Sequence, residues 1–104
     1  MPSYQTVSAA AAKVLLGERT AQIIDIRDAQ AFAQAHIAGA LRIDNSNIDT
    51  FINAVDKTLP LIVCCYHGIS SHNAAQFFAA QGFAEVYSLD GGFEGWCSEF
   101  PNDL

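Results

Sequence analysis

Hydrophobic and polar positions along the chain follow two different periods, which predicts strands alternating with helices. The most informative stretch, 61–72, begins with the apolar run Leu61 to Cys65 and then becomes polar and glycine-containing. An uninterrupted apolar run of this length is typical of a strand buried on both faces. From Ser71 to Gln81, apolar residues recur at three- and four-residue spacings, which predicts a helix. The residues between Cys65 and Ser71 must therefore form a tight loop that leads into a helix N-terminus.

The same pattern of strands and helices is repeated on both sides of this stretch. The predicted strands are 4–7, 21–26, 41–43 and 85–89, and the predicted helices are 9–16, 28–34, 48–55 and a last helix after Gly92. This alternation implies an α/β fold, with a small parallel sheet and helices on both faces. In such sheets ligands bind beyond the carboxyl ends of the strands. The strand ends after Ile26 and Cys65 are therefore the candidate site.

Composition limits the size of the protein and its classes of partner. With 104 residues, of which 51% are hydrophobic and 15% charged, residues 1–104 are expected to form a single domain. The net charge of −6, from five Lys or Arg against eleven Asp or Glu, argues against binding to nucleic acid or to an anionic membrane surface. The N-terminal residues lack a secretory signal pattern, and no apolar run approaches the length of a membrane helix. We therefore expect a cytoplasmic location.

The cysteines are expected to pack in the core or to react as nucleophiles, and not to form a disulfide framework. The chain has three cysteines, two of which are adjacent in the predicted strand, and it lacks a Cys-x-x-Cys spacing. A disulfide framework or a structural metal site is therefore not expected. Cys65 lies between a strand and a helix-entry loop, where exposure and oriented N–H dipoles lower a thiol pKa and make the thiolate a nucleophile. The alternative, a small apolar strand residue, stays open. Cys64 must point to the opposite face and is interpreted as a packing residue. Cys97 is interpreted as a packing residue or as a partly exposed residue without a role.

The loop after Cys65 supplies further candidate residues. His67 can place a partial positive charge or a proton donor in the loop, or it can be an exposed imidazole without a role. Gly68 suits a loop that needs a positive φ to make its N–H groups converge. Ser70 and Ser71 can donate hydrogen bonds to substrate oxygens, and Ser71 can equally be the helix N-cap.

Arg27 and two histidines lie outside this loop. Arg27 can bind an anion at the neighbouring strand end, but it lies between Asp25 and Asp28, so pairing with these carboxylates is favoured. His36 and His72 lack metal-ligand spacing and are interpreted as a core or cap contact and an exposed helix residue.

Four segments occur in order along the chain, Asp25-Ile26-Arg27-Asp28, Phe32 with His36-Ile37-Ala38-Gly39-Ala40, Cys65-Tyr66-His67-Gly68-Ile69-Ser70-Ser71, and Asp90-Gly91-Gly92-Phe93 with Trp96. Together these segments resemble the rhodanese domain family. The loop is most similar to that of the family's short, single-domain thiosulfate sulfurtransferases, which has the form Cys-Tyr-His-Gly-x-Ser-Ser. The similarity extends over nearly the whole chain.

The resemblance implies a rhodanese-like fold and a sulfurtransferase mechanism without a cofactor or metal. The Cys65 thiolate would attack the outer sulfur of thiosulfate, expel sulfite and hold a persulfide. Cyanide, or a dithiol protein such as reduced thioredoxin, would then remove the sulfur. The implied substrate-binding residues are Tyr66, His67, Gly68, Ile69, Ser70, Ser71 and Arg27, with the loop N–H groups stabilising the persulfide and the departing anion.

The sequence departs from the family pattern in two places. The loop has only His67 within it and His72 after it, where arginine or lysine is more usual, so we expect weak affinity for the thiosulfate dianion. Ala35 replaces the usual glycine before His36, which concerns a turn rather than chemistry.

Two other functions compete with this interpretation. Cdc25-like phosphatases have a related fold and a Cys-x5-Arg loop, whose arginine clamps phosphate. Here the sixth residue after Cys65 is Ser71, which disfavours phosphate transfer. Alternatively, the domain is a carrier that accepts sulfur from a protein donor and passes it on.

Overall fold

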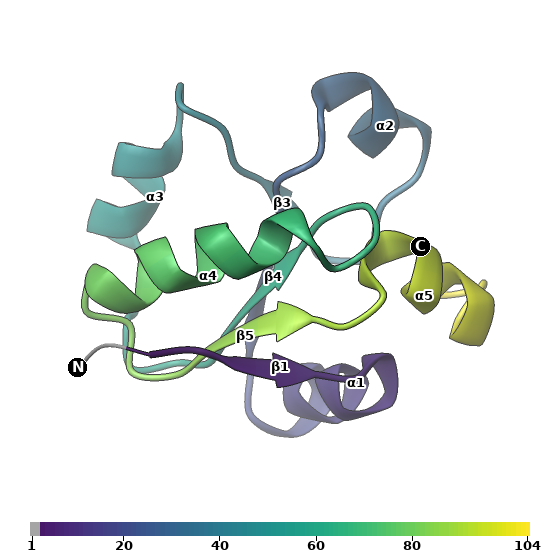
Figure 1. Cartoon of the computed structure of the whole chain (residues 1–104), viewed down its shortest axis with the longest axis horizontal. Coiled ribbons are helices and arrows are strands. Elements are labelled where there is room, and N and C mark those ends of the chain that lie inside the picture. Colours follow the sequence, from purple (N-terminus) through teal and green to yellow (C-terminus); the bar gives the residue numbers. More distant parts are fainter. Residues whose placement is uncertain (1–2) are drawn as a thin grey trace.

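The computed structural model describes residues 3–104. It shows a parallel sheet with helices on both faces (Figure 1). The strands are β1 (Gln5–Val7), β2 (Gln22–Asp25), β3 (Leu41–Arg42), β4 (Leu61–Cys64) and β5 (Val86–Leu89), and the helices are α1 (Ala9–Glu18), α2 (Ala29–Gln34), α3 (Ile48–Ala54), α4 (Ser70–Ala80) and α5 (Gly92–Glu99). The strand order is β1-β5-β4-β2-β3, and each neighbouring pair is parallel. The predicted α/β class is therefore confirmed.

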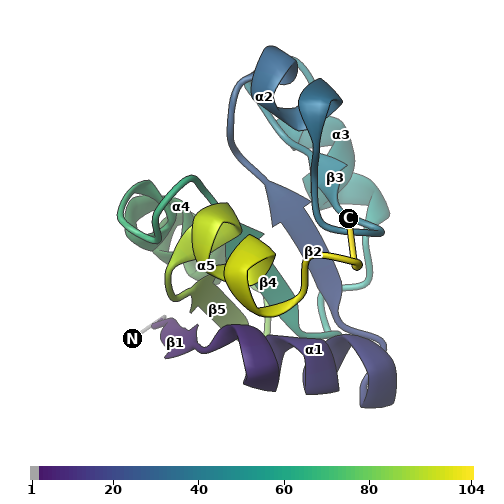
Figure 2. The same ribbon diagram turned by 90° about the vertical axis from the view of Figure 1, so that its right-hand side faces the viewer.

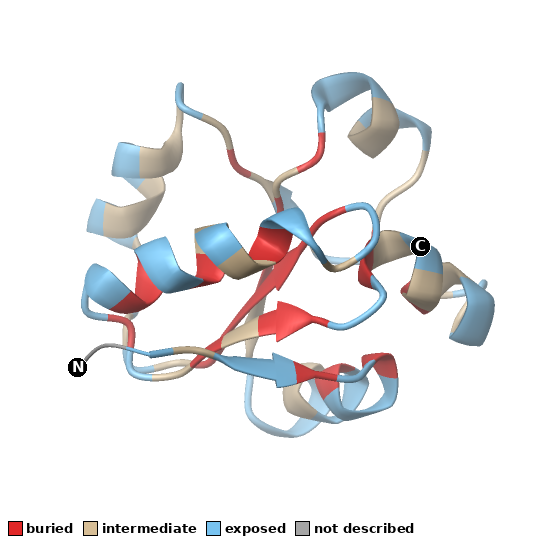
Figure 3. Ribbon diagram, in the orientation of Figure 1, coloured by how far each residue is buried: buried red, intermediate tan, exposed pale blue. Residues whose placement is uncertain are grey.

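The central strand, β4, is buried along its whole length, as its apolar sequence predicts (Figure 3). Side chains alternate between the two faces of a strand. Ile62 and Cys64 pack with α1 and α5 in one hydrophobic core, and Leu61 and Val63 pack with α3 and α4 in the other. An apolar residue is required at each of these positions because both faces of β4 are covered by helices.

The carboxyl ends of β2 and β4 lie side by side. Asp25 is in register with Cys64, and the Ile26 amide donates a hydrogen bond of 2.9 Å to the Cys64 carbonyl. The view in Figure 2 is onto this edge, where α2 and α5 lie. The two strand ends that were predicted to form the site are therefore adjacent.

The observed elements differ from the predicted ones mainly at their ends. The strand predicted for 21–26 is shorter in the structure, and α1 continues through Gly17 to Glu18. Helix α4 begins at Ser70, with Ile69 as its N-cap residue, so the N-cap alternative for Ser71 is wrong. Within residues 3–104, no helix is long and apolar enough to cross a membrane.

Candidate active site

The loop between β4 and α4 closes around the Cys65 sulfur. Backbone amides of Gly68 and Ser71 donate hydrogen bonds to Sγ at 3.2 and 3.3 Å. Cys65 is only 2% exposed, so the expectation of an exposed thiol is wrong. Burial follows from the same geometry, because amide groups can converge on one sulfur only if the chain bends around it.

These hydrogen bonds determine the ionisation of Cys65. Burial alone raises the pKa of Cys65, but hydrogen bonds from the Ser71 side chain and amide, and from the Gly68 and His67 amides, outweigh it. The pKa of Cys65 is therefore below its usual value. Ser71 is itself buried and shares a hydrogen bond of 2.6 Å with the Ser88 hydroxyl. Ser88 on β5 thus fixes the residue that donates to the sulfur.

The N-terminus of α5 holds the outer side of the loop. The Phe93 amide donates to the Cys65 carbonyl at 2.7 Å, and the Glu94 amide donates to the Tyr66 carbonyl at 3.2 Å. The peptide group that contains the Tyr66 carbonyl also contains the His67 N–H, which is directed at the sulfur. Binding the carbonyl on one side therefore orients the N–H on the other, and aligned hydrogen bonds of this kind strengthen one another.

Two glycines allow α5 to approach the loop this closely. A Cβ on Gly92, whose φ is +58°, would lie 2.5 Å from the Cys65 carbonyl oxygen. A Cβ on Gly68, whose φ is +84°, would lie 2.8 Å from the Gly91 nitrogen. The sequence pattern predicted a helix after Gly92 but gave no indication that its N-terminus supports the loop. The two consecutive glycines before a helix are the signal that could have revealed it.

The loop side chains point outward while the amides point inward. The His67 Nδ1 lies 2.9 Å from a Glu94 carboxylate oxygen, and the Tyr66 hydroxyl donates to the Asp28 carboxylate. The Tyr66 hydrogen bond lowers the pKa of Asp28, and the Asp28 carboxylate raises the pKa of Tyr66. Ile69 is 76% exposed, and Ser70 is also exposed. The loop thus presents backbone N–H groups and the Ser71 hydroxyl to the sulfur, while the side chains of His67, Ile69 and Ser70 face solvent.

Arg27 connects several elements beside the loop. Its guanidinium donates to both Asp25 carboxylate oxygens at 2.8–3.0 Å and to the Ala35 carbonyl at 2.7 Å. It also lies 3.9 Å from the Phe93 ring centroid and 5.7 Å from that of Tyr66. Pairing with Asp25, which was favoured from the sequence, is confirmed. Asp28 instead caps α2 and binds Tyr66.

The other two cysteines have different surroundings. Cys64 is fully buried in the core formed with α1 and α5, which confirms its interpretation as a packing residue. Burial, together with the negative charge of Asp25, raises the pKa of Cys64. Burial also raises the pKa of Cys97, which is half-buried in α5. All three cysteines are free.

Both remaining histidines make local contacts. His36 donates a hydrogen bond of 2.9 Å from Nδ1 to the Phe32 carbonyl, as expected of a cap contact. His72 is only half-exposed and shares a hydrogen bond of 2.9 Å with the Tyr4 hydroxyl. Among residues 3–104, no group of three or more His, Cys, Asp or Glu side chains could hold a metal ion.

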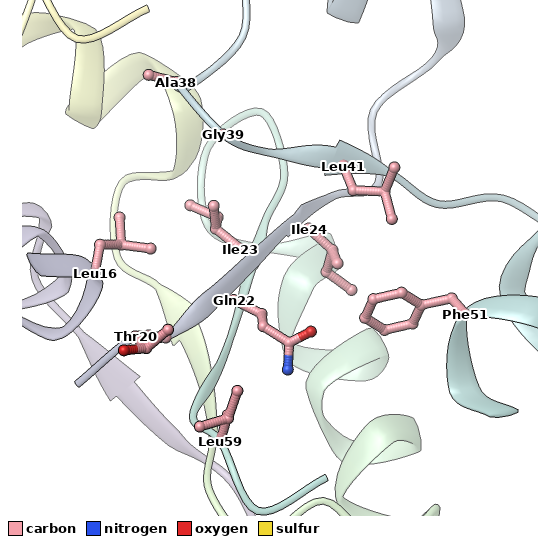
Figure 4. A pocket seen from close by; sticks show the side chains of 11 residues that line it. Leu16, Thr20, Gln22, Ile23, Ile24, Ala38, Gly39, Leu41, Phe51 and Leu59 are labelled. Carbon is pink, nitrogen blue, oxygen red and sulfur yellow. The ribbon is translucent and has the colours of Figure 1, made fainter. Parts of the chain in front are cut away.

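A separate hollow of about 490 Å³ lies along β2 and the edge strand β3 (Figure 4). Its lining includes Gln22, Ile24, Leu41 and Phe51. In the described part of the chain, this lining takes no residue from the 65–71 loop. The candidate chemistry is therefore located at the loop and not at this hollow.

The geometry defines a class of protein before any comparison is made. A buried cysteine whose pKa is lowered by hydrogen bonds, at the carboxyl end of a central parallel strand, has the features expected of a nucleophile in an anion-binding loop. Residues 8–99 match the rhodanese-like domain, and the chain belongs to that family.

The relatives are similar over most of the chain. This chain is 56% identical over 88 residues to thiosulfate sulfurtransferase GlpE of Pseudomonas aeruginosa. The aligned residues make up 85% of this chain and 80% of that protein. It is 51% identical to thiosulfate sulfurtransferase GlpE of Pseudomonas fluorescens, which covers 86% of this chain and 82% of that protein. The resemblance to single-domain thiosulfate sulfurtransferases is therefore confirmed.

Solved structures share the fold. A rhodanese-like domain protein from Staphylococcus aureus superposes with a TM-score of 0.75 at 23% identity and covers 89% of this chain and 90% of that chain. The BH2092 protein from Bacillus halodurans superposes with a TM-score of 0.78 at 28% identity and covers 93% of this chain and 73% of that chain.

Proposed function

We propose that this protein is a thiosulfate sulfurtransferase that moves sulfur from thiosulfate to cyanide or a thiol acceptor through a persulfide on Cys65. The observation that carries the proposal is the convergence of the Gly68 and Ser71 amides on the Cys65 sulfur. Identity of 56% to a relative named thiosulfate sulfurtransferase supports the choice of substrate.

In the first half-reaction, the Cys65 thiolate attacks the outer sulfur of thiosulfate. A bond forms between Sγ and that sulfur, the sulfur–sulfur bond of thiosulfate breaks, and its electron pair leaves with sulfite. The loop amides stabilise the negative charge on the terminal persulfide sulfur, as they stabilise the thiolate before the reaction. The proposed binding residues are Tyr66, His67, Gly68, Ile69, Ser70 and Ser71, acting mainly through their backbone.

In the second half-reaction, an acceptor attacks the outer persulfide sulfur. Cyanide forms thiocyanate and leaves the Cys65 thiolate. With reduced thioredoxin, the first thiolate takes the sulfur, and the second thiol then closes the disulfide and releases hydrogen sulfide. We infer that this occurs in the cytoplasm, where dithiol acceptors are kept reduced.

Anion binding in this site depends on backbone more than on cations. The loop contains no Lys or Arg, and the Arg27 guanidinium is occupied by Asp25 and Ala35. We propose that Arg27 acts on the substrate through its positive charge and through the position of Tyr66 rather than by direct contact. Weak affinity for thiosulfate follows from this arrangement.

Steady-state turnover with thiosulfate and cyanide tests the proposal. Thiocyanate and sulfite should form in equal amounts, Cys65→Ser should abolish both, and Cys97→Ser should retain them. A wild-type protein that accepts sulfur only from a persulfide-bearing protein would be a carrier. Hydrolysis of p-nitrophenyl phosphate that is lost in Cys65→Ser would indicate the phosphatase instead.

A further inference from the structure

An uncharged stretch surrounds the catalytic loop. Between Leu61 and Ala84 the sequence has no Asp, Glu, Lys or Arg, although the chain contains five Lys or Arg and eleven Asp or Glu. This stretch includes the whole loop and the whole of α4. A surface helix normally carries charged residues on its exposed side, so the exposed side of α4 is unusual for a helix facing only water.

The exposed side of α4 carries uncharged side chains, polar ones as well as the aromatic Phe77. Ile69, Asn73 and Phe77 recur every four residues, a spacing that places them along one side of a helix, and all three are exposed. Phe77 is 42% exposed, and Tyr66 in the loop is 43% exposed. We call Ile69, Asn73 and Phe77 the α4 face.

A groove continues the α4 face toward α3. It has a volume of about 390 Å³ and is lined by Ile43, Ile48, Ala74 and Phe77, with Asp44 among its polar residues. Phe77 therefore belongs both to the α4 face and to the wall of the groove. Together they form an apolar surface that runs from the catalytic loop to α3.

Carboxylates border this surface. Asp28 binds Tyr66, Glu94 lies against His67, and Asp44, which is paired with Arg42, lies in the groove lining. Charged residues are depleted at the centres of protein interfaces, where aromatic residues are enriched, and polar residues surround them. An uncharged centre with acidic surroundings complements a partner that has an apolar patch bordered by cations.

We propose that the α4 face is the docking surface for a sulfur-accepting protein whose reactive thiol lies in an uncharged apolar patch bordered by basic residues. The inference rests on the proposed function, because Cys65 is the group that the partner must reach. With Cys65 only 2% exposed, a protein thiol can approach the persulfide only while its surroundings rest against the loop and α4. Cyanide is small enough to need no such support.

The test compares two acceptors, cyanide and reduced thioredoxin, in the full-length protein. Phe77→Asp places a charge where the α4 face meets the groove, and Phe77→Leu keeps the site apolar. Asn73→Arg is a second variant on the same face that leaves the Phe77 contacts with the core intact. Val14→Asp is the matched control, because Val14 is an exposed apolar residue on α1, which packs on the opposite face of the sheet.

We expect Phe77→Asp and Asn73→Arg to lower kcat/KM for thioredoxin by about tenfold or more, the effect of a residue central to an interface. Turnover with cyanide should change by less than about twofold, because small acceptors do not use the α4 face. Phe77→Leu and Val14→Asp should behave like the wild type with both acceptors.

Several results would overturn the inference. Among them are wild-type transfer to thioredoxin in both charged variants, an equal loss in Val14→Asp, or a parallel loss with cyanide. A wild-type dimer that Phe77→Asp converts to a monomer in sedimentation would assign the face to a second copy of the chain. If the wild type forms thiocyanate but never uses thioredoxin, only the docking inference fails. If it forms no thiocyanate, the proposed function itself fails.

Discussion

Cys64 and Cys65 are adjacent and almost equally buried, yet their surroundings shift the pKa values of their thiols in opposite directions. Cys64 is fully buried and Cys65 is 2% exposed. Burial raises the pKa of Cys64, whereas hydrogen bonds lower the pKa of Cys65 in spite of burial. Burial raises the pKa of both thiols, so it does not explain the opposite shifts. The difference comes from the hydrogen bonds that the Ser71 side chain and the loop amides donate to the Cys65 sulfur.

The difference arises where the chain leaves the sheet. At Cys64 the backbone is still part of the ladder, and its carbonyl accepts the Ile26 amide. Amides of the ladder are directed at neighbouring strands and not at side chains. One residue later the chain turns, and the Gly68 and Ser71 amides become free to bind the Cys65 sulfur.

The largest expected contrast comes from replacing each cysteine. Cys65→Ser should lower turnover with thiosulfate and cyanide at least about a thousandfold, as expected for loss of a nucleophile. Cys64→Ala should keep turnover within a few-fold while lowering the free energy of unfolding by about 1–2 kcal/mol, because it leaves a small cavity. Urea denaturation and steady-state assays measure the two effects, and an inactive, fully folded Cys64→Ala would break the contrast.

The next contrast concerns the glycines that support the loop. Gly92→Ala should reduce turnover by about tenfold to a hundredfold, since its Cβ would push the loop away from the geometry that binds the sulfur. Gly39→Ala is the control, because Gly39 has a φ of +85° but no atom within 4 Å of an added Cβ. The positive φ should cost both variants about 1 kcal/mol of stability, and Gly92→Ala should lose more because its Cβ also clashes with the loop backbone. Equal turnover in the two would show that α5 does not hold the loop.

The pH dependence of stability sharpens the comparison further. The raised pKa of Cys64 keeps it protonated in the folded protein above about pH 8.5, where an unfolded thiol ionises, so its contribution to stability is lost as pH rises. The lowered pKa of Cys65 acts in the opposite sense, so its contribution is lost as pH falls through the folded pKa.

Unfolding measured between about pH 6 and 10 separates the two contributions. Relative to wild type, Cys64→Ala should lose less stability at alkaline pH, and Cys65→Ala should lose less as pH decreases. Parallel curves for all three proteins would mean that neither thiol is shifted.

The smallest effect is expected from the contact between His67 and Glu94 on the outer side of the loop. Glu94→Gln removes the charged partner of His67, and an exposed pair contributes up to about 1 kcal/mol, which corresponds to a change of less than about fivefold. The variant still supplies the backbone amide that binds the Tyr66 carbonyl, so the loop should keep its shape. A loss in kcat/KM as large as that of Gly92→Ala would show that the side chain, rather than the amide, organises the loop.

Sequence patterns predicted the strands and helices, and they placed Cys65 where the central strand meets the loop, because these features depend on residues close in the chain. The burial of Cys65 was not predictable in this way. It depends on Phe93 and Glu94 binding the loop from a helix that comes much later in the chain. The Tyr66 contact with Asp28 likewise joins residues from different strand ends. Such contacts follow from tertiary packing, which local periodicity does not encode.

Mass spectrometry of peptides from thiosulfate-treated protein tests the central claim most directly. We predict that the peptide containing Cys64 and Cys65 gains a single sulfur atom that dithiothreitol removes. Fragmentation should assign this atom to Cys65, and Cys65→Ala should gain none while Cys64→Ala gains it as the wild type does. Sulfur on Cys64 or Cys97, or no gain in any protein, would contradict the account that converging amides select Cys65 as the nucleophile.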